Sequence, residues 1–165
     1  MKASAPRRLA AWLVDWLLIS VYAAALIPVG VLFGRSLDLS GLAWNAVSFA
    51  ILVAPVTLWL AAWEARGASP GKRVLRLRVS GVDGDGAPGF GRALVRNLLK
   101  VALPWELAHT GVFLFLKSGE KSGDDTLGTV FIVAAWLVAL AYAACLLPGR
   151  MPYDAVTGLA VGRAQ

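Results

Sequence analysis

The stretch RRLAAWLVDWLL, residues 7 to 18, begins with two arginines, becomes apolar, and then places a carboxylate, Asp15, inside the apolar run. The run continues to residue 33, so 9–33 exceeds the roughly 20 apolar residues that a helix needs to cross about 30 Å of hydrocarbon. A secretory signal sequence has a shorter apolar core, about 7–15 residues, and no use for a carboxylate. The stretch therefore predicts a retained transmembrane helix that contains an unexplained charge.

Two more runs, 42–63 and 129–148, meet the same length criterion. The composition agrees, because 58% hydrophobic and 16% charged residues are typical of a membrane protein and not of a soluble domain. The single cysteine, Cys145, excludes an internal disulfide and a four-cysteine metal site.

A fourth run, 93–116, is less simple because it begins with Arg96 and Lys100 and contains Pro104. A span starting after Pro104 would have about 12 residues, roughly 18 Å of helix, which is too short to cross. We therefore predict one long helix, kinked at Pro104 where an amide donor is missing. Its basic start either extends to the membrane surface or pairs with an acid.

These spans predict an all-α transmembrane fold, a four-helix membrane bundle of two antiparallel hairpins in a single domain over 1–165. The connection at 34–41 is short, so the first two helices should be neighbours. The polar segment 64–91 is predicted to be a cytoplasmic loop with a short strand element.

Within that loop, VLRLRVSG (74–81) alternates apolar and polar residues, as a half-buried strand does. A lone strand is unstable, and GLAVGR (158–163) alternates in the same way. The two stretches either pair or lie separately on the membrane surface. GASPGKR (67–73) lacks the glycine spacing of a phosphate-binding loop, so we expect a tight turn there and lipid headgroup contacts from four basic residues: Lys72, Arg73, Arg76 and Arg78.

The distribution of lysine and arginine predicts the orientation. If both termini are cytoplasmic, the outer loops hold only Arg35, Lys117 and Lys121 of the 16 basic residues, and the inner segments hold the other 13. Because inner segments of membrane proteins are enriched in Lys and Arg, we predict a multi-pass protein of the cell (inner or plasma) membrane with both termini in the cytoplasm. The net charge of +6 then faces anionic headgroups, and nucleic acid is not an expected partner.

Asp15 needs compensation, because a charge near the middle of a span costs about 2.5–3.5 kcal/mol on insertion scales. Arg8 lies on the same helical face but about 10 Å along the axis, and Arg96 starts the third span near the same surface. We favour Asp15 with Arg96 over Asp15 with Arg8. The cluster is either a structural ion pair that fixes the helix arrangement or a proton or cation site.

Glu106 and His109 form a second candidate site. They lie three residues apart on one helical face, near the middle of the third span and toward its outer half. Such a pair can relay protons, or His109 can be a packing residue while Glu106 accepts hydrogen bonds from Asn45, Ser48 or Trp136. We find no metal-ligand cluster, no nucleophile beside a base and no cofactor motif, so we expect neither an enzyme nor a bound cofactor.

Four stretches, RRLAAWLVDWLL, GASPGKRVLRLRVSGVDG, GRALVRNLLK and PYDAVTGLAV, occur in this order along the chain. Together they resemble the RDD family of small helical membrane proteins, named for one arginine and two aspartates. The resemblance assigns the arginine to Arg8 and the aspartates to Asp15 and Asp154. Tyr153 stands where the family commonly has His, so a mechanism that needs that imidazole is not expected here.

The resemblance implies more about fold than about activity, since transport of ions or small solutes is only a common presumption for the family. From the residues we favour an accessory or adaptor subunit that acts as a scaffold in the membrane. The alternative is transport of protons, cations or a small solute through an oligomeric bundle with intramembrane carboxylates. The expected partners are anionic lipid and either further copies of the chain or another membrane protein.

Overall fold

The RRLAAWLVDWLL stretch lies near the start of helix α1 (Ala5–Gly34) in the computed structural model, which describes residues 3–34, 39–82, 86–118, 125–149 and 151–164. The second span is built from α2 (Gly41–Ser48), η1 (Phe49–Val53) and α3 (Ala54–Glu64). The third is built from α5 (Phe90–Asn97), η2 (Leu98–Ala102) and α6 (Leu103–Ser118), and the fourth is α7 (Thr126–Leu146).

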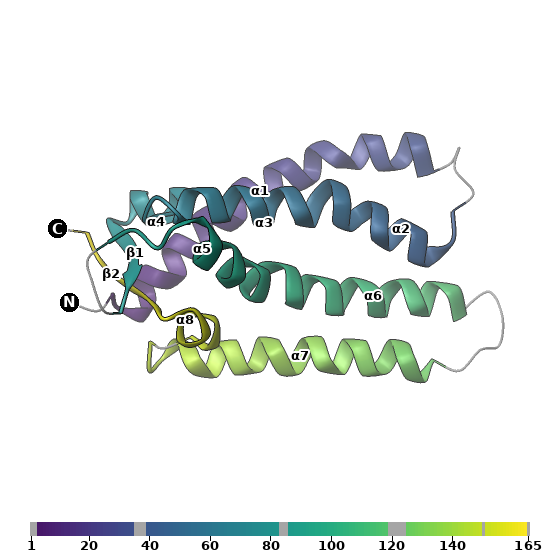
Figure 1. Ribbon diagram of the computed structural model, residues 1–165. Coiled ribbons are helices and arrows are strands. Elements are labelled where there is room, and N and C mark those ends of the chain that lie inside the picture. Colours follow the sequence, from purple (N-terminus) through teal and green to yellow (C-terminus); the bar gives the residue numbers. More distant parts are fainter. Residues whose placement is uncertain (1–2, 35–38, 83–85, 119–124, 150, 165) are drawn as a thin grey trace.

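Each of these four helical segments is long and apolar enough to cross a membrane, which confirms the all-α transmembrane fold. Figure 1 shows them side by side, with α1 joined to α2 and α6 joined to α7 at one end. The second hairpin packs closely, α6 against α7, whereas α1 contacts the rest of the protein mainly through α4 (Pro70–Val74). The first hairpin is therefore the more open of the two.

The second and third spans share an irregularity. In each, a π-helical segment ends two residues before a proline: η1 before Pro55 and η2 before Pro104. Proline has no amide hydrogen, so the ordinary helical hydrogen bond is missing at that position, and a π segment changes the bonding pattern without ending the helix. The third span is thus continuous through Pro104, with η2 immediately on its N-terminal side.

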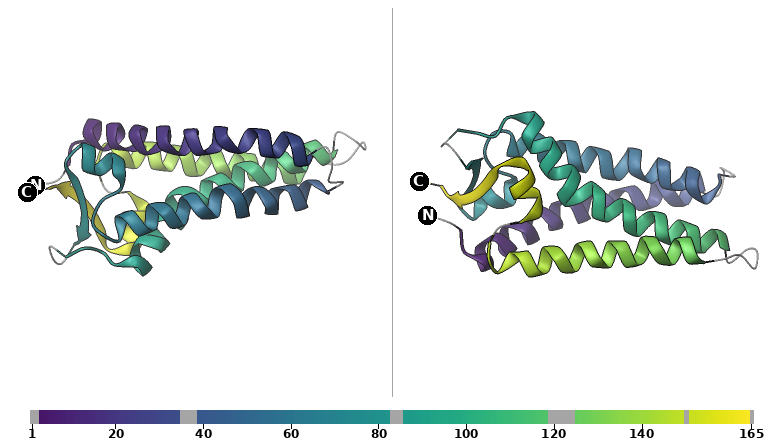
Figure 2. Two further views of the ribbon diagram at one scale, coloured as in Figure 1. Left: turned by 90° about the horizontal axis from the view of Figure 1, so that it is seen from above. Right: turned by 60° about the horizontal axis from the view of Figure 1, so that its bottom comes forward.

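The end of the bundle that we call the sheet end carries the small elements (Figures 1 and 2). Strand β1 (Leu77–Gly81) pairs antiparallel with β2 (Leu159–Arg163), with Val79 opposite Val161. This confirms that the two alternating stretches pair. The buried side of the pair packs against α1 through Ala11, and α8 (Pro152–Thr157) leads into β2. We call the opposite end of the bundle the far end.

Of the basic residues used to predict the orientation, Lys2, Arg35, Lys121 and Arg150 lie outside the described residues. The described basic side chains whose contacts are given below lie on the first turn of α1 and on α4, α5 and η2. The first turn of α1, together with α4, α5 and η2, lies at or near the sheet end (Figure 1).

Candidate functional site

Asp15 is buried, with 3% of its surface exposed, and it is held by uncharged donors. One carboxylate oxygen accepts a hydrogen bond from the Ser69 hydroxyl at 2.6 Å, and the other accepts from the backbone N–H of Gly71 at 2.8 Å. The expected pair with Arg96 is therefore wrong, and Asp15 does not pair with Arg8 either. The turn before α4 lies against α1, so the Ser69 hydroxyl and the Gly71 amide contact the carboxylate. Gly71 is in the first turn of α4, where backbone amides have no hydrogen-bond partner within the helix.

The short distance between α1 and α4 depends on Gly71. A Cβ atom at this position would lie 2.1 Å from the backbone oxygen of Ala11 and 3.0 Å from the Asp15 carboxylate. Only glycine fits there. The GASPGKR stretch is therefore more than a turn, because its serine and second glycine bind the intramembrane aspartate directly.

Glu64, the last residue of α3, is fully buried and is the centre of the charged cluster. Its Oε1 accepts from Lys72 Nζ at 2.5 Å and from Lys100 Nζ at 3.3 Å. Its Oε2 accepts from Arg96 and from Asn97 Nδ2, the latter at 2.9 Å. Four donors from three segments of the chain thus converge on one carboxylate.

Asp154, on α8, is the second centre. Its Oδ1 accepts from Arg96 Nε at 2.7 Å, and its Oδ2 accepts from Arg8 at 3.1 Å. Arg8 also donates to the carbonyl of Gly149 at 2.5 Å, and the guanidinium of Arg96 lies 5.1 Å from the centre of the Tyr153 ring. Tyr153 therefore packs against an arginine in the cluster.

These contacts form one continuous chain of partners, because Lys72 also donates to Ser69 Oγ at 3.2 Å and so connects Asp15 to Glu64. We call this set the charge network; its charged members are Arg8, Asp15, Glu64, Lys72, Arg96, Lys100 and Asp154. It joins α1, α3, α4, α5, η2 and α8. Arg8, Asp154 and Arg96 are in direct contact, and Asp15 joins them only through other residues.

The charge network carries a surplus of positive charge. Its formal charges are four positive and three negative, a net charge of +1 among the described residues. Burial lowers the pKa of Lys72 to about 8, against the attraction of Glu64, and the nearby positive charges of Lys100 and Arg96 act in the same direction as burial.

The basic residues expected at lipid headgroups divide into two groups. Lys72 is buried in the charge network and is not available to headgroups, so that assignment is wrong for it. Arg73, Arg76 and Arg78 are exposed, and Arg73 lies over the Trp63 ring, 4.4 Å from its centre. Contact of these three with headgroups stays a prediction.

Glu106 and His109 both lie on α6 but do not hydrogen-bond to each other. Glu106 accepts from Asn45 Nδ2 of α2 at 3.3 Å, and its other carboxylate oxygen is buried with no partner among the described residues. The His109 ring stacks on Trp105, with centres 4.8 Å apart. Of the partners suggested for Glu106, Asn45 is the one observed, and the two residues are not joined as a relay.

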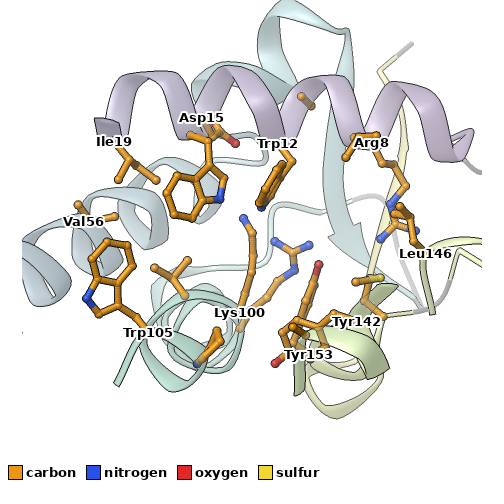
Figure 3. Close-up of a pocket in the computed structure, with 18 of the residues that line it drawn as sticks. Arg8, Trp12, Asp15, Ile19, Val56, Lys100, Trp105, Tyr142, Leu146 and Tyr153 are labelled. Carbon is orange, nitrogen blue, oxygen red and sulfur yellow. The ribbon is translucent and has the colours of Figure 1, made fainter. Parts of the chain in front are cut away.

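Beside the charge network lies a cavity of about 680 Å³ between α1, η2, α6 and α7. Figure 3 shows Lys100 extending across it toward α1, with Trp12 opposite, Ile19, Val56 and Trp105 on one side and Arg8 on the other. The cavity is thus charged toward the sheet end and apolar toward the middle of the bundle. No group of three or more metal-binding side chains occurs in the described ranges.

Sequence reasoning missed three members of the site: Glu64, Ser69 and Asn97. Because Glu64 ends an apolar run, the sequence pattern assigns it to the start of the loop. The signal that could have found it is charge balance, since Arg96 and Lys100 need an acid and Glu64 is the acid at the same end of the neighbouring span.

The fold and site define a polytopic membrane protein in which one buried charge network ties the helices together at one end. The RDD family model matches residues 2–148, and the chain belongs to the RDD family. The match includes Arg8 and Asp15, and Asp154 lies beyond it. Comparison with curated proteins and with solved structures finds no match.

Proposed function

We propose that this protein is an accessory subunit of the inner or plasma membrane, a scaffold that holds a fixed platform of short elements at the cytoplasmic surface. The platform consists of α4, β1, α8 and β2, and the sheet end is proposed to face the cytoplasm. The surplus of basic residues in these segments supports that orientation.

The observation that carries the proposal is the pairing of the charged side chains. The signature residues Arg8, Asp15 and Asp154 are each bonded to other parts of the chain, and none of the three is more than partly exposed. Buried ion pairs specify one arrangement more reliably than they add stability. A network of this kind suits a scaffold, whereas a group that binds and releases a proton or cation must change its partners during each cycle.

The proposed partner is another membrane protein or a further copy of this chain. The four spans bury only part of one another's surface. In the apolar 18-residue stretch that marks the fourth span, no residue is buried within the protein. On the platform, Arg76 and Arg78 are exposed and offer positive charge to an acidic surface of the partner.

The test is site-specific photocrosslinking in cells. A photoreactive residue at position 76 or 78 should give one discrete crosslinked product, whereas the same residue at Leu140, exposed on α7, reports contacts within the membrane. With the photoreactive residue at position 76, Arg78→Glu should abolish the platform product without lowering the amount of folded protein. Absence of any product from both faces would contradict the scaffold role.

Transport is the second candidate, and one observation favours it. Glu106 is a carboxylate within a span with one oxygen unpartnered among the described residues, and His109 lines the cavity on the same helix. In proteoliposomes with an imposed pH gradient, the scaffold role predicts that the wild-type protein dissipates the gradient no faster than empty liposomes. Faster dissipation that Glu106→Gln abolishes, in folded protein, would establish transport instead.

A further inference from the structure

Lys100 is the cation that the charge network pairs least completely. Its ion pair is with Glu64 Oε1 at 3.3 Å, and that oxygen already accepts from Lys72 at 2.5 Å. The network has one positive charge more than its carboxylates balance, and the Lys100 side chain lines the cavity. A buried surplus charge is costly unless an opposite charge comes close, so the cavity favours an anion at this point.

Beyond Lys100 the cavity wall is aromatic and aliphatic. The Trp12 and Trp16 rings lie 5.5 Å apart, Trp16 stacks on Trp105 at 6.1 Å, and Ile19 and Val56 complete this part of the wall. Ligand pockets of about 300–1,000 Å³ with mostly apolar walls and a few polar groups are typical of small-molecule sites. At about 680 Å³, this cavity falls in that range.

The cavity is accessible from the bilayer side. Leu9 and Trp12, on the α1 side of the cavity, are 44% and 43% exposed. Its wall on α7 consists partly of small residues, Ala139 and Ala143, both exposed. A molecule in the surrounding leaflet can therefore reach the cavity between α1 and α7.

We propose that this cavity binds an anionic lipid from the leaflet at the sheet end, with the headgroup phosphate at Lys100 and acyl carbon atoms against Trp12, Trp16 and Trp105. A free inorganic anion fits less well, because it would leave the aromatic part of the cavity unfilled. A zwitterionic lipid fits less well, because its ammonium group meets a network that is already positive. The inference is independent of the proposed scaffold role.

The experiment is native mass spectrometry of the detergent-purified protein, titrated with phosphatidylglycerol or phosphatidylcholine. The wild-type protein should bind the anionic lipid about tenfold more tightly, because both headgroups offer a phosphate to Lys100 but only phosphatidylcholine brings an ammonium group toward the positive network. Lys100→Met should reduce this preference to near one. Arg163→Gln removes an exposed cation at the same end that does not line the cavity, and it should keep the preference.

A second variant tests the cavity separately from the charge. Ala143→Trp places a large side chain in the wall and retains Lys100, so it should weaken binding of phosphatidylglycerol as strongly as Lys100→Met does. Unchanged binding in Ala143→Trp would place the lipid outside the cavity and overturn the proposal, and so would an unchanged preference in folded Lys100→Met. Displacement of the lipid by inorganic phosphate at equal concentration would overturn it as well, because it would show a simple anion site.

Discussion

At the level of single residues, both carboxylate oxygens of Asp15 accept hydrogen bonds from uncharged donors inside a span, and none of these bonds comes from a cation. Its two oxygens take one hydroxyl and one backbone N–H, and hydrogen bonds to a charged group contribute about 1.5–3 kcal/mol each. Two such bonds offset an insertion cost of about 2.5–3.5 kcal/mol. Lys72 donates to Ser69 Oγ, whose hydroxyl donates to Asp15, and the charges of Lys72 and Asp15 also attract each other directly.

The first prediction concerns this carboxylate. Asp15→Ala should lower the free energy of unfolding by about 2–4 kcal/mol, because it leaves the Ser69 hydroxyl and the Gly71 amide buried without an acceptor. Asp15→Asn keeps one acceptor and should cost less than half as much. Thermal unfolding in detergent measures both, and Asp125→Asn is the control because Asp125 is exposed and caps no amide with its side chain. Equal losses in Asp15→Ala and the control would refute the assignment.

The second prediction concerns Lys72, whose pKa falls from 10.5 to about 8 on burial. Between these two values the unfolded chain binds more protons than the folded one, so this group's contribution to the free energy of unfolding should rise with pH, by at most about 1.4 kcal/mol per pH unit. Below pH 8 its contribution should not change. Lys72→Arg stays charged throughout this range.

The check is to measure the melting temperatures of the wild type and of Lys72→Arg from pH 7 to 10 and to take the difference between them at each pH. The difference should be constant below about pH 8 and then grow in favour of the wild type. Other groups titrate alike in both proteins and cancel. A difference that stays constant up to pH 10 would show that Lys72 is not shifted.

At the level of elements, the spans and the strand pair follow from simple periodicity. The length of apolar runs predicts four helices, and alternation in two distant stretches predicts two strands, both of which are observed. The π segments η1 and η2 could not be predicted in this way. They depend on how the helix around Pro55 and Pro104 adjusts its hydrogen bonds, and hydropathy carries no information on that.

The contacts among elements are predicted less well, for a physical reason. Helix periodicity predicts which face of the helix a charged residue occupies, but it does not predict which neighbouring element will contact that face in the folded protein. The sequence favours Arg96, on a neighbouring span, as the partner of Asp15, yet α4 folds back against α1 and takes the carboxylate with Ser69 and Gly71. By contrast, the resemblance singles out Arg8 and Asp154, and these two residues are in direct contact in the structure.

The third prediction tests the contact of α4 with α1. Gly71→Ala should destabilise the protein by about 2–3 kcal/mol, because the added methyl group collides with the backbone oxygen of Ala11, which cannot move independently of the helix. Gly30→Ala is the matched control, since nothing lies within 4 Å of the position that its methyl group would take and alanine favours a helix. Comparable melting temperatures for the two variants would contradict the close approach.

The fourth prediction tests Glu64 as the link between α3, α4 and α5. Glu64→Gln should cost about 3–5 kcal/mol, the loss typical of leaving buried charges without their partner. Adding Lys100→Met removes one of the three cations around this site, so the double variant should recover part of the loss, with a coupling free energy of about 1–2 kcal/mol. Additive losses in the unfolding measurement would show that Lys100 and Glu64 do not interact.

At the level of the whole molecule, the charges and the apolar surface are segregated along one axis. The charge network and the exposed arginines of α4 and β1 lie at the sheet end (Figure 1), and the spans beyond it are mostly apolar. Sequence alone predicts this segregation, because it follows from counting charges by segment. It does not predict the cavity beside Lys100, because its walls come from several elements whose spacing depends on the packed structure.

The segregation leads to the last prediction, the orientation of the protein in the membrane. In a Cys145→Ala background, a single cysteine at Ala160, exposed on β2 at the sheet end, should react with a membrane-impermeant maleimide only after the membrane is inverted or opened. A cysteine at Asp125, exposed beside α7 at the far end, should react in intact cells. The reason is that translocating the basic platform would move many arginines and lysines across the membrane, against the bias that sets topology. The reverse labelling pattern would place the platform outside the cell, where a scaffold role toward a cytoplasmic surface is impossible.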